Sequence, residues 1–125
     1  MKRHTVLIVD DQPPILELWA RILSAEGYSV SCASDAIEAL HLLAARRPTV
    51  AICDVHLPGP NGLWLADMIR RQSPSTAIVI VSADPFVPPR ETLRPSVVGY
   101  LLKPVAREEL TSIVKTAVAW ASGGN

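Results

Sequence analysis

Three short apolar runs with no polar alternation limit the folds that this chain can adopt. They occupy residues 6–9, 50–53 and 77–81. Strands buried on both faces have this pattern, which is typical of parallel sheets covered by helices on both sides. The expected strands, including two weaker candidates, span residues 6–10, 28–32, 50–54, 77–81 and 98–102. We therefore expect an α/β fold.

Helical patterns lie between the expected strands. Apolar residues recur at helical spacing over residues 15–23, after two prolines that suit a first turn, and Gly27 follows as a stop signal. Asp35 and Glu38 have the spacing of a capping box, which predicts a second helix ending before Pro48. The remaining predicted helices cover residues 62–72 and about 106–121.

Prolines interrupt the segment where this alternation would place a helix between the fourth and fifth strands. They are Pro85, Pro88, Pro89 and Pro95. A proline inside a helix costs about 3 kcal/mol, so we expect this helix to be short or irregular, with at most a turn near residues 90–94. The overall prediction is one three-layer α/β/α domain over residues 1–125, with right-handed crossovers.

Composition excludes several kinds of partner. Twelve Lys and Arg residues balance twelve Asp and Glu residues, so nothing in the net charge favours nucleic acid or an anionic membrane. No segment approaches the roughly 20 apolar residues of a membrane span, and the N-terminus is unlike a signal peptide, which predicts a cytoplasmic protein. Cys32 and Cys53 lie in apolar runs and are expected to be small core residues.

Polar residues follow the expected strands. Asp10 and Asp11 follow the first, Asp54 ends the third, Ser82 follows the fourth, and Lys103 follows the fifth. In open α/β sheets ligands bind at the carboxyl ends of the strands, so these side chains are expected to converge on one pocket. Several carboxylates at one edge require neutralisation by a cation or by proton uptake.

The ordered set of motifs resembles the receiver domains of bacterial two-component response regulators over essentially the whole chain. The spacing agrees, with 43 residues from Asp11 to Asp54, 28 from there to Ser82 and 21 on to Lys103. The matching motifs are Asp10-Asp11, residues 54–62, Ser82-Ala83, Tyr100 and Lys103-Pro104. The resemblance implies a doubly wound, five-stranded parallel sheet with strand order 2-1-3-4-5, the flavodoxin-like order.

The resemblance also implies a phosphoryl-accepting function. Asp54 would take a phosphoryl group from a histidine kinase or a histidine phosphotransfer protein. Asp11 and Asp54 would bind Mg²⁺ through side-chain oxygens, His56 through its backbone carbonyl, and Asp10 would hold a metal-bound water. Such a domain catalyses only its own phosphorylation and dephosphorylation and is not an enzyme in the usual sense.

The remaining implied roles concern the phosphorylated state. Lys103 would pair with the phosphoryl charge, Ser82 would hydrogen-bond a phosphoryl oxygen, and Tyr100 would be the coupled switch aromatic. By resemblance, the side chains of His56 and Asp84 would influence how long the acyl phosphate survives. The proline-rich segment departs from the family pattern. This departure favours an unusual partner surface or altered dimerisation, and the sequence leaves open whether the domain forms a homodimer.

Two other functions are compatible with parts of this pattern. A receiver-like scaffold would bind partners independently of phosphorylation, but it does not require an intact acidic pocket. A phosphatase of the haloacid dehalogenase type also uses an aspartyl nucleophile beside Mg²⁺. That class expects a second acid two residues after the nucleophile, where this chain has His56.

Overall fold

Strands and helices alternate along the chain. The computed structural model describes residues 3–85 and 94–123. In that part the elements are β1 (Thr5–Val9), α1 (Pro13–Ala25), β2 (Ser29–Ala33), α2 (Ala36–Ala45), β3 (Val50–Asp54), α3 (Gly62–Gln72), β4 (Ala77–Ser82), β5 (Val97–Leu102) and α4 (Arg107–Ala121). The five strands and the four predicted helices outside the proline-rich segment are all present, with bounds within a few residues of those expected.

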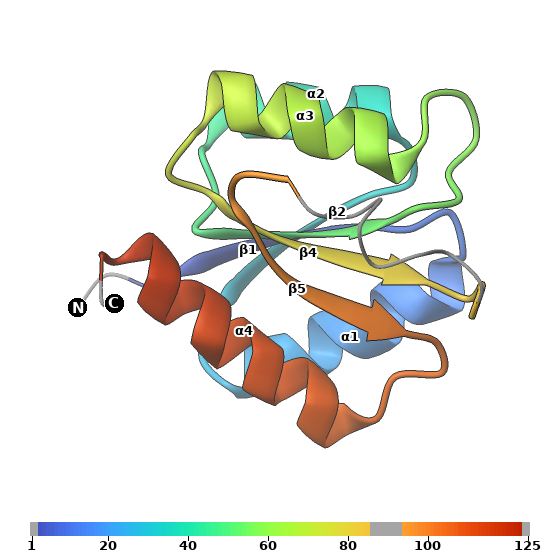
Figure 1. Cartoon of the computed structure of the whole chain (residues 1–125). Helices are drawn as coiled ribbons and strands as arrows, with labels where there is room; N and C mark the ends of the chain where they lie inside the picture. Colours follow the sequence, from blue (N-terminus) through green and yellow to red (C-terminus); the bar gives the residue numbers. More distant parts are fainter. Residues whose placement is uncertain (1–2, 86–93, 124–125) are drawn as a thin grey trace.

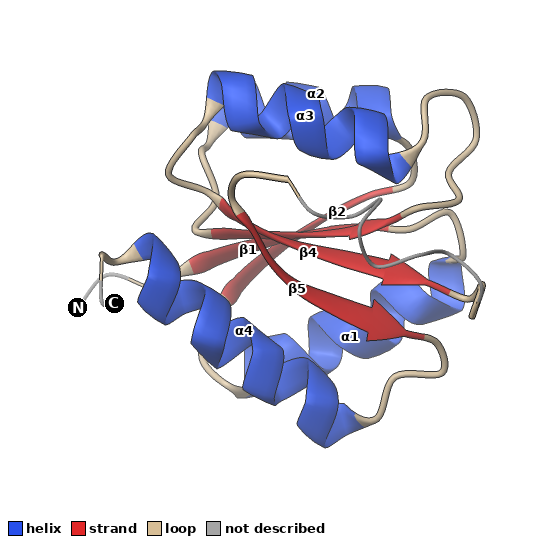
Figure 2. Cartoon of the chain, in the orientation of Figure 1, coloured by secondary structure: helices blue, strands red, loops and turns tan. Residues whose placement is uncertain are grey.

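The strands form one parallel sheet with the order β2-β1-β3-β4-β5. Figures 1 and 2 show α2 and α3 on one face of the sheet and α1 and α4 on the other. The predicted three-layer, doubly wound architecture is therefore confirmed. Because β1 and β3 are neighbours in this order, residues that follow them lie side by side at one edge.

The core has two halves, one on each face of the sheet. Leu7 and Val9 pack toward α2 and α3, whereas Val6 and Ile8 pack toward α1 and α4. Every residue of β3 and β4 is buried. A strand covered on both faces needs apolar residues at consecutive positions, which explains the unbroken runs in the sequence.

Local signals set several helix ends. Pro13 opens α1, and Gly27, with φ +96°, takes the left-handed conformation just beyond its end. At α2 the Asp35 carboxylate accepts the Glu38 N–H at 2.8 Å, as the capping-box pattern predicts. The reciprocal bond differs, because the Glu38 carboxylate accepts from the N–H of Ser34 at 2.7 Å.

The predicted short or irregular helix falls mainly on residues 86–93, which lie outside the described residues. The flanking residues 83–85 and 94–96 form bends, turns and loop. Beside β5, the Arg94 Nε donates to Asp67 Oδ1 of α3 at 2.9 Å. This ion pair attaches the approach to β5 to the helical layer above the sheet.

The two cysteines have different environments. Cys53 is fully buried in β3, as predicted, and burial raises the pKa of its thiol to about 12. Cys32 is exposed, so its assignment to the core was wrong. It lies on β2 at the edge of the sheet, where only Ala33 of the five strand residues is buried.

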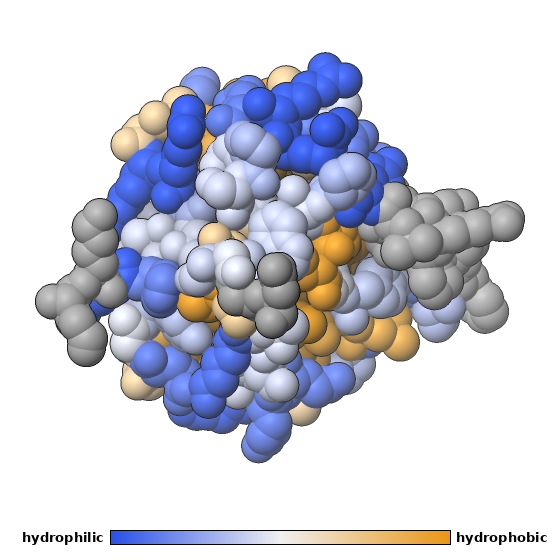
Figure 3. Space-filling model, turned by 60° about the vertical axis from the view of Figure 1, so that its left-hand side comes forward, coloured by the Kyte–Doolittle hydropathy of each residue, from blue (hydrophilic) through white to orange (hydrophobic). Residues whose placement is uncertain are grey.

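The surface follows the layered arrangement. On the face in Figure 3, hydrophilic residues dominate the upper and lower parts, and apolar residues form a strip between them. The large apolar side chains with the greatest exposure among the described residues are Leu18, Ile37, Trp64, Leu102 and Trp120. In that same portion of the chain no helix has the length and apolar character needed to cross a bilayer.

A buried hydroxyl network joins the amino-terminal ends of β3 and β4, and its removal is expected to destabilise the fold. Thr76 Oγ1 donates to the Pro48 carbonyl at 2.7 Å and lies 2.6 Å from Ser73 Oγ. Thr76→Val leaves both partners buried and unpaired, which predicts a loss of about 1–3 kcal/mol in urea unfolding. The control Thr111→Val removes only an exposed hydrogen bond and should change stability by less than about 0.5 kcal/mol.

Candidate functional site

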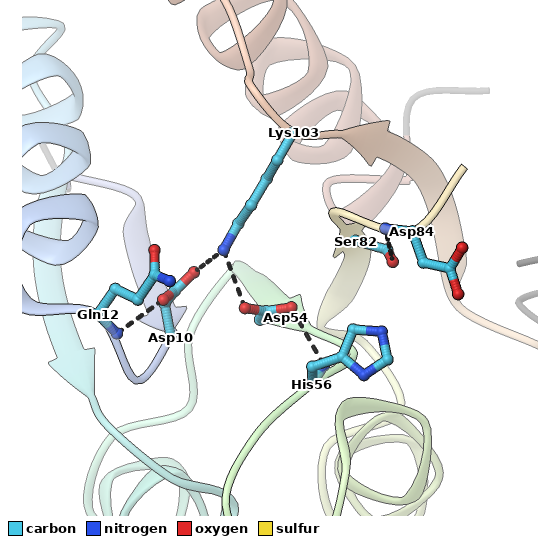
Figure 4. Close-up of polar contacts among 7 residues, drawn as sticks. All are labelled: Asp10, Gln12, Asp54, His56, Ser82, Asp84 and Lys103. Carbon is cyan, nitrogen blue, oxygen red and sulfur yellow. Dashed lines mark hydrogen bonds and ion pairs between the residues drawn. The ribbon is translucent and has the colours of Figure 1, made fainter. Parts of the chain in front are cut away.

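The functional residues meet where parallel strands end. Asp10 follows β1, Asp54 is the last residue of β3, and Lys103 follows β5. All strands of the sheet run in the same direction, so their carboxyl ends lie at one edge. Figure 4 shows Asp10 and Asp54 approaching the tip of the Lys103 side chain. The predicted convergence of these three residues is present.

Three carboxylates form one cluster. Asp10, Asp11 and Asp54 each offer an oxygen, and these oxygens all lie within 4.8 Å of one another. Asp10 is 1% exposed and Asp54 is 5% exposed, whereas Asp11 faces solvent. Burial raises the pKa of Asp10, although hydrogen bonds to its carboxylate act in the opposite direction. The cluster is therefore an electrostatically costly group of acids with one side open to water.

Lys103 partly neutralises this cluster. Its Nζ donates to Asp10 Oδ2 at 2.6 Å and to Asp54 Oδ2 at 2.9 Å. Burial alone lowers the pKa of Lys103, but the two carboxylate hydrogen bonds outweigh that effect, so the pKa is raised. One ammonium cannot balance three ionised carboxylates, and the remaining negative charge favours binding of a further cation.

Backbone donors hold the other carboxylate oxygens. The N–H of Gln12 donates to Asp10 Oδ1 at 2.9 Å, and the N–H of His56 donates to Asp54 Oδ1 at 3.1 Å. Each buried aspartate thus has one oxygen on a backbone amide and the other on Lys103. These bonds fix the orientation of both side chains (Figure 4).

Ser82 and Tyr100 stand apart from the ion-paired cluster. Ser82 is fully buried at the end of β4, and its hydroxyl accepts the N–H of Asp84 at 3.0 Å. Tyr100 of β5 is half-buried and packs against the core half that includes α2 and α3. In Figure 4 the His56 ring and the Asp84 carboxylate project away from the three ion-paired side chains.

A groove of about 420 Å³ adjoins the acidic cluster. Ile15, Leu18 and Trp19 of α1 line one part of it, and Pro104 and Val105 line another. Lys103 also contributes to its lining, so the groove and the acidic cluster share one side chain. Apolar surface therefore lies directly beside the charged site.

Sequence reasoning missed some of the contacts that shape the site. It placed Lys103 near a phosphoryl group but did not anticipate its hydrogen bond to Asp10, because residues 93 positions apart give no local signal of a preferred partner. It also gave no role to the backbone of Gln12. Gly62 lies within a matching motif, but the motif itself gives no sign of how closely this glycine approaches the Asp54 backbone.

Family comparison agrees with this geometry. The model of the response regulator receiver domain family matches residues 6–115. The chain therefore belongs to the response regulator receiver domains of two-component signalling and is not a conventional enzyme. Its acidic triad is typical of the Mg²⁺ site of receivers.

Relatives with known names include larger regulators. The chain is 38% identical over 116 residues to the positive alginate biosynthesis regulatory protein of Pseudomonas aeruginosa, covering 90% of this chain and 46% of that protein. It is 47% identical over 81 residues to the nitrogen assimilation regulatory protein NtrX of Azorhizobium caulinodans, covering 63% and 18%. The chain thus spans less than half the length of these curated relatives.

Solved structures show the same fold. A signal receiver domain of an HD domain-containing protein from Pseudomonas fluorescens Pf-5 superposes with a TM-score of 0.91 at 31% identity, covering 98% of this chain and 92% of that chain. A CheY-like receiver domain protein from Methanospirillum hungatei JF-1 gives a TM-score of 0.92 at 26% identity, covering 99% and 100%.

Removing the ammonium should destabilise the metal-free protein. Lys103→Met leaves Asp10 and Asp54 buried without their cation, which predicts a loss of about 3 kcal/mol in urea unfolding with EDTA at neutral pH. Since the pKa of Asp10 is already raised, the variant should regain stability as Asp10 takes up a proton. The loss should therefore shrink when unfolding is repeated at about pH 4.5.

Lys115→Met is the matched control, because Lys115 is an exposed residue of α4. It should lose less than about 0.5 kcal/mol at either pH. Equal stability of the two variants at neutral pH would show that Lys103 does not compensate the buried carboxylates.

Proposed function

We propose that this domain accepts a phosphoryl group on Asp54 from a phosphohistidine of a partner protein. The observation that carries the proposal is the convergence of three aspartate side chains and one lysine ammonium at a single edge of the sheet. A carboxylate nucleophile beside a cation site and a lysine has the parts needed for phosphoryl transfer to an aspartate.

The donor set fits Mg²⁺. Asp10, Asp11 and Asp54 supply only oxygen, which hard divalent cations prefer, and the solvent-facing side at Asp11 leaves room for water ligands. Asp11, Asp54 and the His56 carbonyl would hold the ion directly, and Asp10 would act through a bound water. When bound, the ion neutralises the excess carboxylate charge and stabilises negative charge on the phosphoryl oxygens.

The chain's own residues then have distinct tasks. An oxygen of Asp54 forms a bond to phosphorus as the bond from phosphorus to the donor imidazole nitrogen breaks, and the bonding pair stays on that nitrogen. The backbone N–H of His56 keeps the carboxylate oriented. Lys103, already 2.9 Å from Asp54 Oδ2, pairs its ammonium with the charge of the arriving group.

Ser82 and Tyr100 would transmit the modification. The Ser82 hydroxyl would release the N–H of Asp84 and bind a phosphoryl oxygen, and Tyr100 would move in response. Tyr100 is half-buried on the edge strand β5, so its movement would alter the surface near that strand. Phosphorylation is thus a local electrostatic change that biases a two-state element.

The partner is proposed from the same chemistry. A histidine kinase or a histidine phosphotransfer protein would donate the phosphoryl group, and the domain would act in the cytoplasm. The chain spans only part of the length of its regulator relatives. We therefore propose no specific output protein or output domain for the phosphorylated state. We propose no direct contact of this domain with nucleic acid, since the net charge of the domain is zero.

The test is phosphorylation of the intact chain by a small-molecule phosphodonor. We expect a mass gain of about 80 Da that requires Mg²⁺, is lost with EDTA and is absent in Asp54→Asn. The reason is that the amide is a poor nucleophile and a weaker cation ligand than the carboxylate. Intact-protein mass spectrometry measures the gain.

The matched control is Asp35→Asn, which keeps a side chain that can cap α2 and should be modified like the wild type. No mass gain in the wild type would contradict the proposal and favour a scaffold that acts without phosphorylation. Repeated hydrolysis of the donor with many turnovers would favour a phosphatase instead.

The lifetime of the modified state should depend on His56 and Asp84. Both side chains lie at the site's margin, two residues beyond Asp54 and Ser82 respectively. Their removal changes access of attacking water to the acyl phosphate, so we expect the dephosphorylation rate of the double alanine variant to change by about threefold or more. An unchanged decay of the mass-shifted species would contradict this prediction.

A further inference from the structure

The first residue of α3 lies directly against the peptide that carries the proposed nucleophile. The N–H of Gly62 donates to the Val55 carbonyl at 2.9 Å. A Cβ built on Gly62 would lie 2.0 Å from the Asp54 carbonyl oxygen and 2.7 Å from the Asp54 carbonyl carbon. No larger residue fits at this position unless the backbone of Asp54 or the start of α3 moves.

The obstacle at Gly62 differs from that at another crowded glycine. A Cβ at Gly99 would lie 2.4 Å from Ile113 Cδ1 and 2.7 Å from Ile113 Cγ1, so it would meet side-chain atoms of a single residue. At Gly62 all three nearest atoms belong to the backbone, and they come from Asp54 and Val55. Accommodation at Gly62 therefore displaces main chain at the site, whereas accommodation at Gly99 repacks one side chain.

We propose that Gly62 is a positioning residue that acts through Asp54. Its missing side chain lets α3 begin in contact with the end of β3, and this contact fixes the peptide of Asp54 and the turn that leads to His56. The inference rests on the proposed function and deepens it, because it names a residue outside the charged cluster on which the cation site depends.

Small displacements matter at this position. One carboxylate oxygen from each of Asp10, Asp11 and Asp54 lies within 4.8 Å of the other two. Mg²⁺ requires near-ideal octahedral geometry at short distances, so a shift of about 1 Å in one ligand weakens binding strongly. Gly62 contacts the backbone of Asp54 and Val55, which carries one proposed ligand and leads directly to His56, whose N–H orients the Asp54 carboxylate.

The main experiment compares Gly62→Ala with Gly99→Ala in the full chain. Calorimetric titration measures Mg²⁺ affinity, and urea unfolding in EDTA measures stability. We expect Gly62→Ala to weaken Mg²⁺ binding at least about tenfold and Gly99→Ala to stay within about twofold of the wild type, even where their stability losses are similar. A folded Gly62→Ala protein with wild-type Mg²⁺ affinity would overturn the proposal.

If Gly62→Ala does not fold, a second pair of variants tests whether the start of α3 controls Mg²⁺ affinity. Asn61 caps α3 by accepting the Trp64 N–H at 2.9 Å, and Asp35 caps α2 in the same way at 2.8 Å. Asn61→Ala loosens the turn that contains Gly62, so it should weaken Mg²⁺ binding about threefold or more, whereas Asp35→Ala at 0.15 M salt should not. Equal Mg²⁺ affinities of these two variants would overturn the proposal.

Phosphorylation of the same variants separates this inference from the proposed function. The Mg²⁺ concentration that gives half the maximal phosphorylation rate should rise for Gly62→Ala in parallel with the calorimetric constant. A wild-type chain that binds Mg²⁺ but is never phosphorylated would contradict the proposed function and leave the calorimetric comparison of the glycine variants intact.

Discussion

The sheet topology brings the carboxyl ends of the strands to one edge, and the ion pairs of Lys103 with Asp10 and Asp54 hold these strand ends together. Each aspartate alone would be a buried acid with an unfavourable charge, and the ammonium 2.6 and 2.9 Å away compensates much of that cost. These bonds also tie the ends of β1, β3 and β5 to one another. The residual negative charge keeps the same cluster receptive to a divalent cation.

The order of the strands determines which residues can cooperate. With β1 and β3 as neighbours, the acids at their carboxyl ends form one cluster without any long loop. The position of α3 also affects the end of β3, because Gly62 at the start of α3 contacts the main chain of Asp54. Chemistry at one side chain therefore depends on packing between a helix and the backbone beneath it.

Many of the strands and helix ends could be predicted from the sequence, because they depend on residues that are close together in the chain. Burial on both faces produces the apolar run that became β3, and Gly27 marked the end of α1 through its own backbone conformation. The strand order came from the family resemblance rather than from the apolar pattern. Contacts between distant residues left no such trace, as with Lys103 and Asp10, and the exposure of Cys32 depends on β2 lying at the sheet edge.

The contrast between the two cysteines has a practical consequence for experiments. A thiol with a pKa of about 12 inside β3 is closed to alkylating reagents at neutral pH, although it directly precedes Asp54. Cys32 on the outer strand is exposed to them, although burial of part of its side chain also raises the pKa of its thiol. The chain can therefore receive a single maleimide-linked fluorophore or spin label at Cys32 without mutagenesis, on the strand at the opposite edge of the sheet from β5.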